Sequence, residues 1–118
     1  MHPPSDQIRL VLCSTCQSHA TTTEQIESVQ EALCQAGLQS HVELAEHPCL
    51  NACGAPVTIG LQGTGRATYV FSDVEPVTDA ADIAATCQSY LDSPKGWIED
   101  ARSCGRLRLC LKARLPAL

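Results

Sequence analysis

The chain has 118 residues, of which 44% are hydrophobic and 3% aromatic, and its formal net charge is −5. This length and composition fit one globular domain with an aliphatic core, and they exclude a disordered chain or two ordinary domains. The acidic balance argues against a nucleic-acid partner and favours a basic protein partner. No apolar run is long enough to span a membrane, and the N-terminus lacks the features of a secretory signal, so we expect a cytoplasmic protein.

The first part of the chain predicts a strand, a loop and a helix. Alternating hydrophobic residues predict a strand over residues 8–13. The polar residues 14–23 predict a loop. A capping-box pattern and an apolar stripe then predict a helix over residues 22–36, which Gly37 would end.

The next elements predict three more strands and a second helix. Strands are expected over residues 41–46, 56–61 and 67–72, with a glycine-rich hairpin turn at residues 62–65, and a helix over residues 79–91. A strand, a crossover helix and a second strand form a right-handed parallel unit. The element order therefore predicts an α/β, thioredoxin-like fold with a mixed four-stranded sheet and two main helices.

The domain organisation is read from composition and charge. Residues 1–6 are expected to be a disordered lead and residues 7–96 the folded domain. Residues 1–96 have 3 basic and 11 acidic groups, giving −8, whereas residues 97–118 have 5 basic and 2 acidic groups, giving +3. We expect residues 97–118 to be a basic C-terminal arm, packed on the domain or at a homodimer interface. Strict alternation over residues 106–115 predicts an extended arm, although its leucine spacing also fits a helix.

Two short cysteine pairs are the most informative feature of the chain. Cys13 and Cys16 form a C-x2-C pair at the end of the first strand, and Cys49 and Cys53 form a C-x3-C pair after the second. Eight cysteines in a reducing cytoplasm would stay thiols, which favours metal ligation or thiol chemistry for the clustered ones. Because the ends of two parallel strands lie side by side, we expect both pairs at one edge of the sheet. The alternative is that they are small buried hydrophobic residues.

The other candidate ligands have simpler interpretations. Cys87 lies on the apolar stripe of the second helix and is expected in the core, whereas Cys34 should be partly exposed. Cys104 and Cys110 would be ligands only if the arm folds over the site. Two histidines flank the cysteine pairs, where solvated loop histidines are commoner than ligands: His19 and His47.

Three chemistries fit the cysteine pairs. Four thiolates from two loops hold a [2Fe–2S] cluster, and the absence of any other catalytic pattern suits an electron carrier rather than an enzyme. Four thiolates also hold one zinc or cobalt ion, although structural zinc sites favour C-x2-C in both loops. Thiol–disulfide exchange by Cys13 and Cys16 is the third, but Cys16 would precede the helix, and Cys49 and Cys53 would have no role.

The sequence Cys49-Leu-Asn-Ala-Cys53-Gly-Ala-Pro-Val resembles thioredoxin-like [2Fe–2S] ferredoxins and the small cluster subunit of bacterial respiratory NADH dehydrogenase. Those proteins have a Cys-Leu-Gly-x-Cys loop followed by Ala-Pro-x-Val. Here the gap from Cys53 to Ala55 is one residue shorter, and the first cysteine pair is closer together. The resemblance implies a [2Fe–2S] cofactor on Cys49 and Cys53, with Cys34 as the alternative to Cys16 for the fourth ligand.

Over most of its length the chain is similar to a bacterial family of uncharacterised, predicted metal-binding proteins. The matching segments are residues 12–16, 49–53, 68–71, 90–96 and 113–116. This resemblance implies a ferredoxin-like protein with a redox partner connected to cobalt or cobalamin metabolism. We therefore expect a [2Fe–2S] electron carrier with mononuclear zinc or cobalt binding as the alternative.

Overall fold

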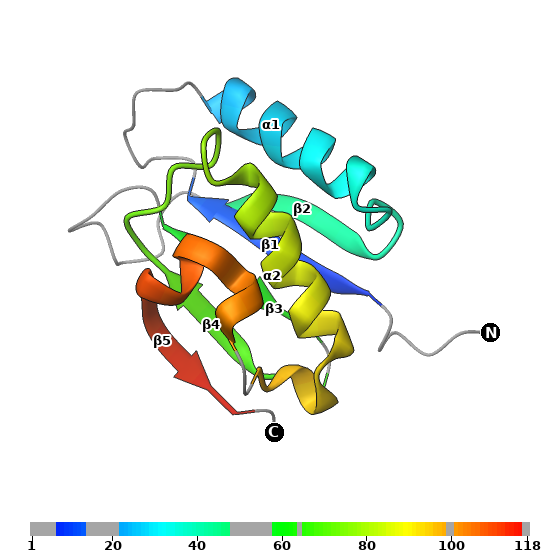
Figure 1. Cartoon of the computed structure of the whole chain (residues 1–118), viewed down its shortest axis with the longest axis vertical. Coiled ribbons are helices and arrows are strands. Elements are labelled where there is room, and N and C mark those ends of the chain that lie inside the picture. The colour runs from blue at the N-terminus through cyan, green and yellow to red at the C-terminus, as the bar shows by residue number, and fades with distance from the viewer. Residues whose placement is uncertain (1–6, 14–21, 48–57, 64, 99–100, 117–118) are drawn as a thin grey trace.

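The computed structural model describes residues 7–13, 22–47, 58–63, 65–98 and 101–116 (Figure 1). Residues 1–6, predicted to be a disordered lead, lie outside this part. The elements are β1 (Ile8–Cys13), α1 (Thr22–Gln35), β2 (Val42–His47), β3 (Ile59–Gln62), β4 (Thr68–Phe71), α2 (Ala80–Asp92), the 3₁₀ turns η2 (Pro94–Gly96) and η3 (Ala101–Leu109), and β5 (Leu111–Leu115). No described helix is long and apolar enough to cross a membrane.

The strands form one mixed sheet in the order β2-β1-β3-β4-β5. Strand β1 is parallel to β2 and antiparallel to β3, and β3–β4 and β4–β5 are antiparallel. The predicted mixed α/β class with two main helices is confirmed. The predicted count of four strands was wrong, because the C-terminal residues Leu111–Leu115 add a fifth strand beside β4.

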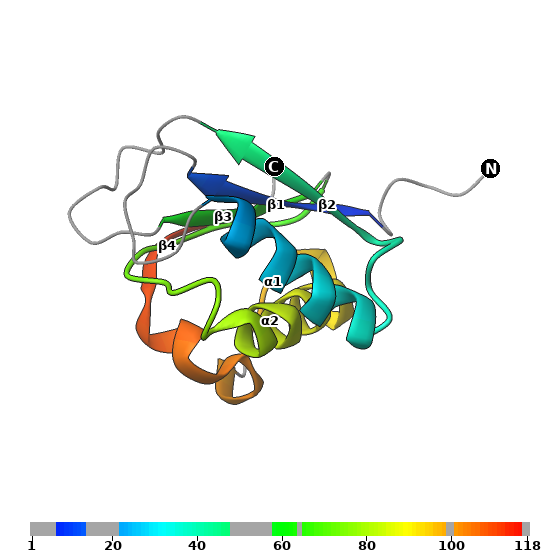
Figure 2. The same cartoon turned by 90° about the horizontal axis from the view of Figure 1, so that it is seen from above.

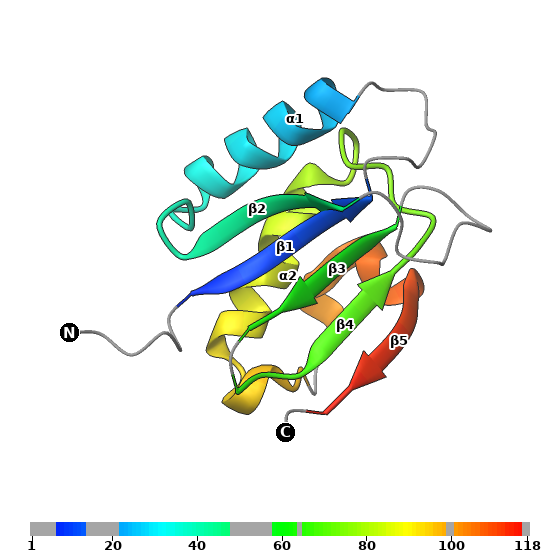
Figure 3. The same cartoon turned by 180° about the vertical axis from the view of Figure 1, so that it is seen from behind.

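Both main helices cover the same face of the sheet (Figure 2), and the other face is free of described helices (Figure 3). The alternation in β1 explains this arrangement, because Leu10 and Leu12 are fully buried under the helices while Arg9 is exposed. Burying one such leucine contributes about 1.5–3 kcal/mol. Residues from every layer join the core, including Ile8, Leu10, Leu12, Val29, Leu33, Ile59, Leu61, Ile83, Tyr90 and Leu107.

Helix α1 ends at Gln35, two residues before the glycine that the sequence indicated as its stop. The Gly37 N–H donates to the Cys34 carbonyl at 3.0 Å, and the Leu38 N–H donates to the Leu33 carbonyl at 2.8 Å. This pair of bonds requires a left-handed residue between them, and Gly37 has φ +74°. The bonds turn the chain toward β2 and set the crossover that makes β1 and β2 parallel.

The C-terminal residues differ from the extended arm predicted over residues 106–115. Residues up to Leu109 are 3₁₀-helical, and the extended conformation starts at Leu111. Gly105 makes a kink within η3, where it has φ +62° and a Cβ would clash with the carboxylate of Asp82. The spacing of the leucines was also compatible with a helix. Leu107 is fully buried, and its packing against α2 favours the helical conformation.

Arg106 connects η3 to the start of α2 through hydrogen bonds and an ion pair. Its guanidinium donates to the Asp79 carboxylate at 2.6 Å and to the Asp73 backbone carbonyl at 3.0 Å, and its backbone N–H donates to Asp82 at 3.1 Å. The Asp79 side chain is 7% exposed, so its charge is compensated mainly by this contact and by the Glu75 N–H at 2.9 Å. The neighbouring Asp79 raises the pKa of Arg106 above its ordinary value.

Replacing Arg106 by alanine should destabilise the fold by about 2 kcal/mol, because a buried carboxylate loses its charged partner. The measurement is urea unfolding at neutral pH. Arg108→Ala removes the same charge from an exposed position two residues away and should change the free energy of unfolding by less than about 0.5 kcal/mol. Equal effects of the two substitutions would contradict the role assigned to Arg106.

Candidate functional site

The ends of β1 and β2 define the candidate site. Cys13 is the last residue of β1 and is the register partner of His47, the last residue of β2. Neighbouring strands lie about 4.8 Å apart. Residues 14–21 and residues 48–57, which contain the other predicted cysteine ligands and lie outside the described residues, therefore follow two adjacent strand ends in the sequence.

Several other elements begin or end at this edge, which we call the carboxyl edge. Leu12 of β1 is in register with Ile59, so β3 begins beside the end of β1. Ile59 is in turn in register with Phe71, so β4 ends at the same edge. The starts of α1 and α2 also lie on this side (Figure 1). Ligands of open α/β sheets bind outside the carboxyl ends of the strands.

Three of the four predicted ligands lie outside the described residues: Cys16, Cys49 and Cys53. For Cys13 the structure gives the backbone position at the end of β1. Within the described ranges, no group of three or more histidine, cysteine, aspartate or glutamate residues could hold a metal ion. A metal centre at the carboxyl edge would therefore need side chains from residues 14–21 and 48–57, and His19 belongs to the first of these segments.

Cys34 lies far from the carboxyl edge. It is exposed, as predicted, and is twelve positions after Thr22, which corresponds to about 18 Å along the helix. It lines a surface hollow of about 540 Å³ together with Val42, the first residue of β2, and with Glu27 and Glu31. This position argues against Cys34 as the fourth ligand beside Cys13.

Three other cysteines are buried. Cys87 is in the core, as predicted, and burial followed by the neighbouring Cys104 raises the pKa of its thiol to about 12. Cys104 and Cys110, both in the C-terminal part of the chain, are buried and belong to the hydrophobic core. Burial raises the pKa of Cys110, while Arg106 lowers it. A thiol held neutral is a poor nucleophile and a poor metal ligand, so Cys87 is structural.

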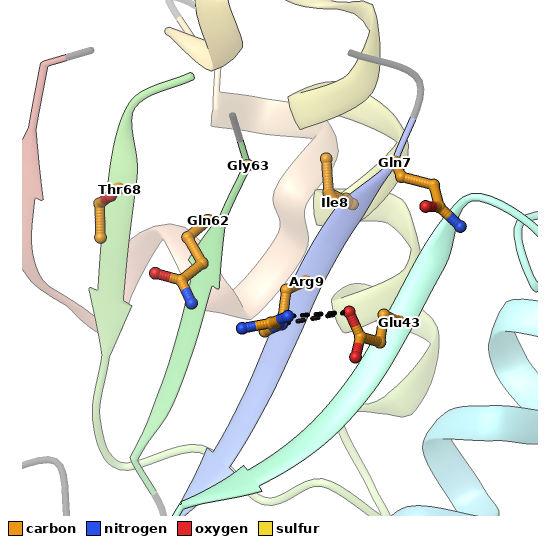
Figure 4. A pocket seen from close by; sticks show the side chains of 7 residues that line it. All are labelled: Gln7, Ile8, Arg9, Glu43, Gln62, Gly63 and Thr68. Atoms are coloured by element: carbon orange, nitrogen blue, oxygen red, sulfur yellow. Dashed lines mark hydrogen bonds and ion pairs between the residues drawn. The ribbon is translucent and has the colours of Figure 1, made fainter. Parts of the chain in front are cut away.

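A second hollow lies at the opposite edge of the sheet. It has a volume of about 410 Å³ and is lined by the starts of β1, β2 and β4 and by the end of β3 (Figure 4). Arg9 and Glu43 form an exposed ion pair at 3.2 Å across it, and Gln62 lies beside them. Ile8 in this hollow is five positions before Cys13 in β1, which corresponds to about 16 Å along the strand. The hollow is therefore separate from the cysteine edge.

The sequence reasoning missed the contact between Arg106 and Asp79. Asp79 was expected to start a helix, but its side chain accepts hydrogen bonds from Arg106 and from the Glu75 backbone. The available signal was an acidic residue at a helix start together with a basic arm elsewhere in the chain. That signal does not identify which arginine is the partner.

Comparison with known proteins gives one match. A family model described as "Protein of unknown function (DUF1636)" matches residues 10–117. No curated protein and no solved structure matches the chain.

Thiol labelling should distinguish the cysteines by burial. With iodoacetamide under native conditions, we expect Cys34 to be alkylated readily, and Cys87 and Cys110 to react only after denaturation. Peptide mass spectrometry reads each site separately. Rapid native labelling of Cys87 would contradict its position in the core.

The raised pKa of Cys87 should make the protein less stable in alkaline solution. Its folded-state pKa of about 12 exceeds its ordinary value of 9.0, so the unfolded chain loses the proton first. The stabilising effect of the neutral thiol is complete below pH 9 and is lost as the pH rises toward 12. The slope from this group approaches about 1.4 kcal/mol per pH unit.

Urea unfolding between pH 8 and pH 10 measures that slope. In the Cys87→Ala variant the free energy of unfolding should decline less steeply with pH than in the unsubstituted protein. Slopes are compared, rather than absolute free energies, because the substitution also removes packing contacts. If the slope were the same in Cys87→Ala, the pH dependence of stability could not be attributed to Cys87. Burial raises the pKa of Tyr90 from 10.0 to about 12, so this residue adds its own decline as the pH approaches 10, and that decline is present in both proteins when their slopes are compared.

Proposed function

The chain belongs to the family described as "Protein of unknown function (DUF1636)", and from this premise we propose that it is a small, ferredoxin-like electron carrier. In this proposal a [2Fe–2S] cluster is held by Cys13, Cys16, Cys49 and Cys53. Two cysteine pairs on two loops are the donor set that such a cluster requires. When bound, the cluster accepts and releases one electron at a time.

The observation that supports this proposal best is the register of Cys13 with His47. Covalent geometry limits the span of the chain to about 3.6 Å per residue. Cys49 follows His47 by two residues, so their Cα atoms are at most about 7 Å apart. By the same rule Cys16 stays within about 11 Å of Cys13. Together with the spacing of adjacent strands, these limits allow three of the thiols to converge near the paired strand ends.

The carboxyl edge is also electrostatically suited to thiolates. Helix N-termini favour nearby negative charge, and both α1 and α2 begin on this side of the sheet (Figure 2). The strand order β2-β1-β3-β4, with β3 antiparallel to its neighbours, is the arrangement expected for a thioredoxin-like core. These features support the ligand set without distinguishing a cluster from a single zinc or cobalt ion.

The side of the domain formed by α1 and β2 is acidic and fits a basic redox partner. Residues 22–47, which form α1 and β2, include five glutamates and no lysine or arginine. All five are exposed: Glu24, Glu27, Glu31, Glu43 and Glu46. A surface of one charge sign steers association with a partner of the other sign. The resemblance described above points to cobalt or cobalamin metabolism as the setting of that partner.

Anaerobic purification followed by spectroscopy tests the proposal. We expect a coloured protein whose visible bands bleach with dithionite and which contains iron and acid-labile sulfide in equal amounts. Cys49→Ser and Cys53→Ser should each abolish cofactor binding. Cys34→Ser should retain it, and Cys87→Ala should retain it while losing on the order of 1 kcal/mol of stability.

Two outcomes would overturn the cluster assignment. A colourless protein that releases about one zinc or cobalt ion per chain, and loses it in Cys49→Ser, would instead support the mononuclear metal site. A metal-free protein that reduces insulin disulfides through Cys13 and Cys16 would support thiol–disulfide exchange.

A further inference from the structure

Strand β5 ends the sheet on the side away from β2, and no described strand covers its outer edge. All five of its residues, Leu111–Leu115, are exposed. An edge strand presents unpaired backbone N–H and C=O groups along its outer side. We propose that the β5 edge, together with the exposed residues Arg108 and Leu109 before it, docks an acidic, extended segment of a partner protein as a sixth strand.

Exposed leucines first identify this surface. Of the four large hydrophobic side chains that are exposed in the described part of the chain, three lie between residues 109 and 115. Leu109 is 79% exposed, Leu111 41% and Leu115 61%. Proteins place charged residues on edge strands to prevent unwanted strand pairing. Lys112 in β5 would fit that role if the leucines were absent. Three exposed leucines work against such protection and fit a surface that is covered by another chain.

The positive charge of the β5 side indicates that the docked segment is acidic. Residues 101–116 include five basic residues and no acidic residue, and one of the five, Arg106, is paired with Asp79 and Asp73. Arg108, Lys112 and Arg114 are exposed along the β5 side. Alternation of leucine with basic residues fits an incoming strand that alternates apolar and acidic residues, because side chains directly opposite each other in a sheet pair by charge and by packing.

Arg114 is held in place before any partner binds. Its guanidinium carbon lies 3.9 Å from the centre of the Trp97 ring, and it donates to the Ile98 carbonyl at 3.4 Å. A charged side chain fixed on an aromatic ring loses less entropy when it forms a further contact. Trp97 is the single tryptophan of the chain, so its fluorescence reports events at β5.

Other occupants fit this surface less well. In an antiparallel β5–β5 dimer centred on Ala113, Lys112 would lie opposite Arg114 of the second copy, and like charges in that position are destabilising. Pairing β5 with the acidic β2 of another copy is head-to-tail and does not close into a dimer. In a lipid bilayer the edge N–H and C=O groups would stay unsatisfied. A strand from another protein satisfies both the backbone groups and the charges.

Titration of the purified full chain with synthetic peptides tests the proposal. The probe is a blocked peptide of about seven residues, an ordinary strand length, that alternates valine and glutamate. We expect its binding to change Trp97 emission saturably and to slow amide hydrogen exchange of residues 111–115. Added salt should weaken the binding. A peptide with lysine in place of glutamate, and one N-methylated at alternate residues, should not bind.

Matched protein variants locate the binding. Lys112→Gln should raise the Kd about two- to fivefold, the effect of one cross-strand charge pair. Arg9→Gln removes the same charge from β1, which is three strands away from β5, and should leave the Kd unchanged. Equal binding of the lysine peptide, an equal effect of the two variants, or no binding of the glutamate peptide would overturn the proposal.

Two further outcomes would identify a different occupant. If vesicles of anionic phospholipid change Trp97 emission and the glutamate peptide does not, the surface binds membranes and the proposal fails. If sedimentation shows that the chain self-associates and that Lys112→Gln alters this, the surface contacts a second copy instead. The peptide titration uses no bound cofactor, so its failure is distinguishable from failure of the electron-carrier function.

Discussion

The parallel pairing of β1 with β2 is the constraint on which the rest of the structure depends. It places Cys13 and His47 side by side and makes two segments that are distant in sequence begin at one edge. The crossover through α1 requires the chain to reverse after Gln35, and the left-handed Gly37 provides that reversal. The proximity of the two strand ends is therefore a consequence of backbone topology.

The second organising contact is the ion pair between Arg106 and Asp79. It joins the C-terminal residues to the start of α2, and β5 follows directly after the helical turn that contains Arg106. A carboxylate buried as deeply as Asp79 is costly without a charged partner, so the contact favours one docking position for η3. That position then brings Leu111–Leu115 beside β4 in antiparallel register.

Much of the fold could be predicted from local patterns, and the failures have physical causes. Alternation in β1 and the glycine after α1 act through short-range geometry, so those elements were predicted nearly to the residue. The pattern of residues 106–109 fits both the two-residue period of a strand and the period of a helix. Their helical conformation depends on contacts with Asp79 and Asp82, which are distant in sequence.

For the candidate site, the element order predicted that the ends of β1 and β2 share one edge of the sheet, and the helical spacing of apolar residues predicted that Cys87 is buried. The other predicted ligands belong to residues 14–21 and 48–57, where no strand or helix pattern in the sequence predicts a side-chain orientation.

The charge distribution separates the two proposed interactions in space. The five glutamates of residues 22–47 lie on α1 and β2, and the five basic residues of residues 101–116 lie on η3 and β5. Strands β2 and β5 are at opposite ends of a five-stranded sheet, about 19 Å apart. This separation exceeds the Debye length of about 8 Å at physiological ionic strength, so each surface attracts its own partner with little cancellation by the other. A basic redox partner at the acidic end and an acidic strand at β5 can therefore bind at the same time. In that arrangement β5 would fix the protein to one partner while the cysteine edge stays accessible to another.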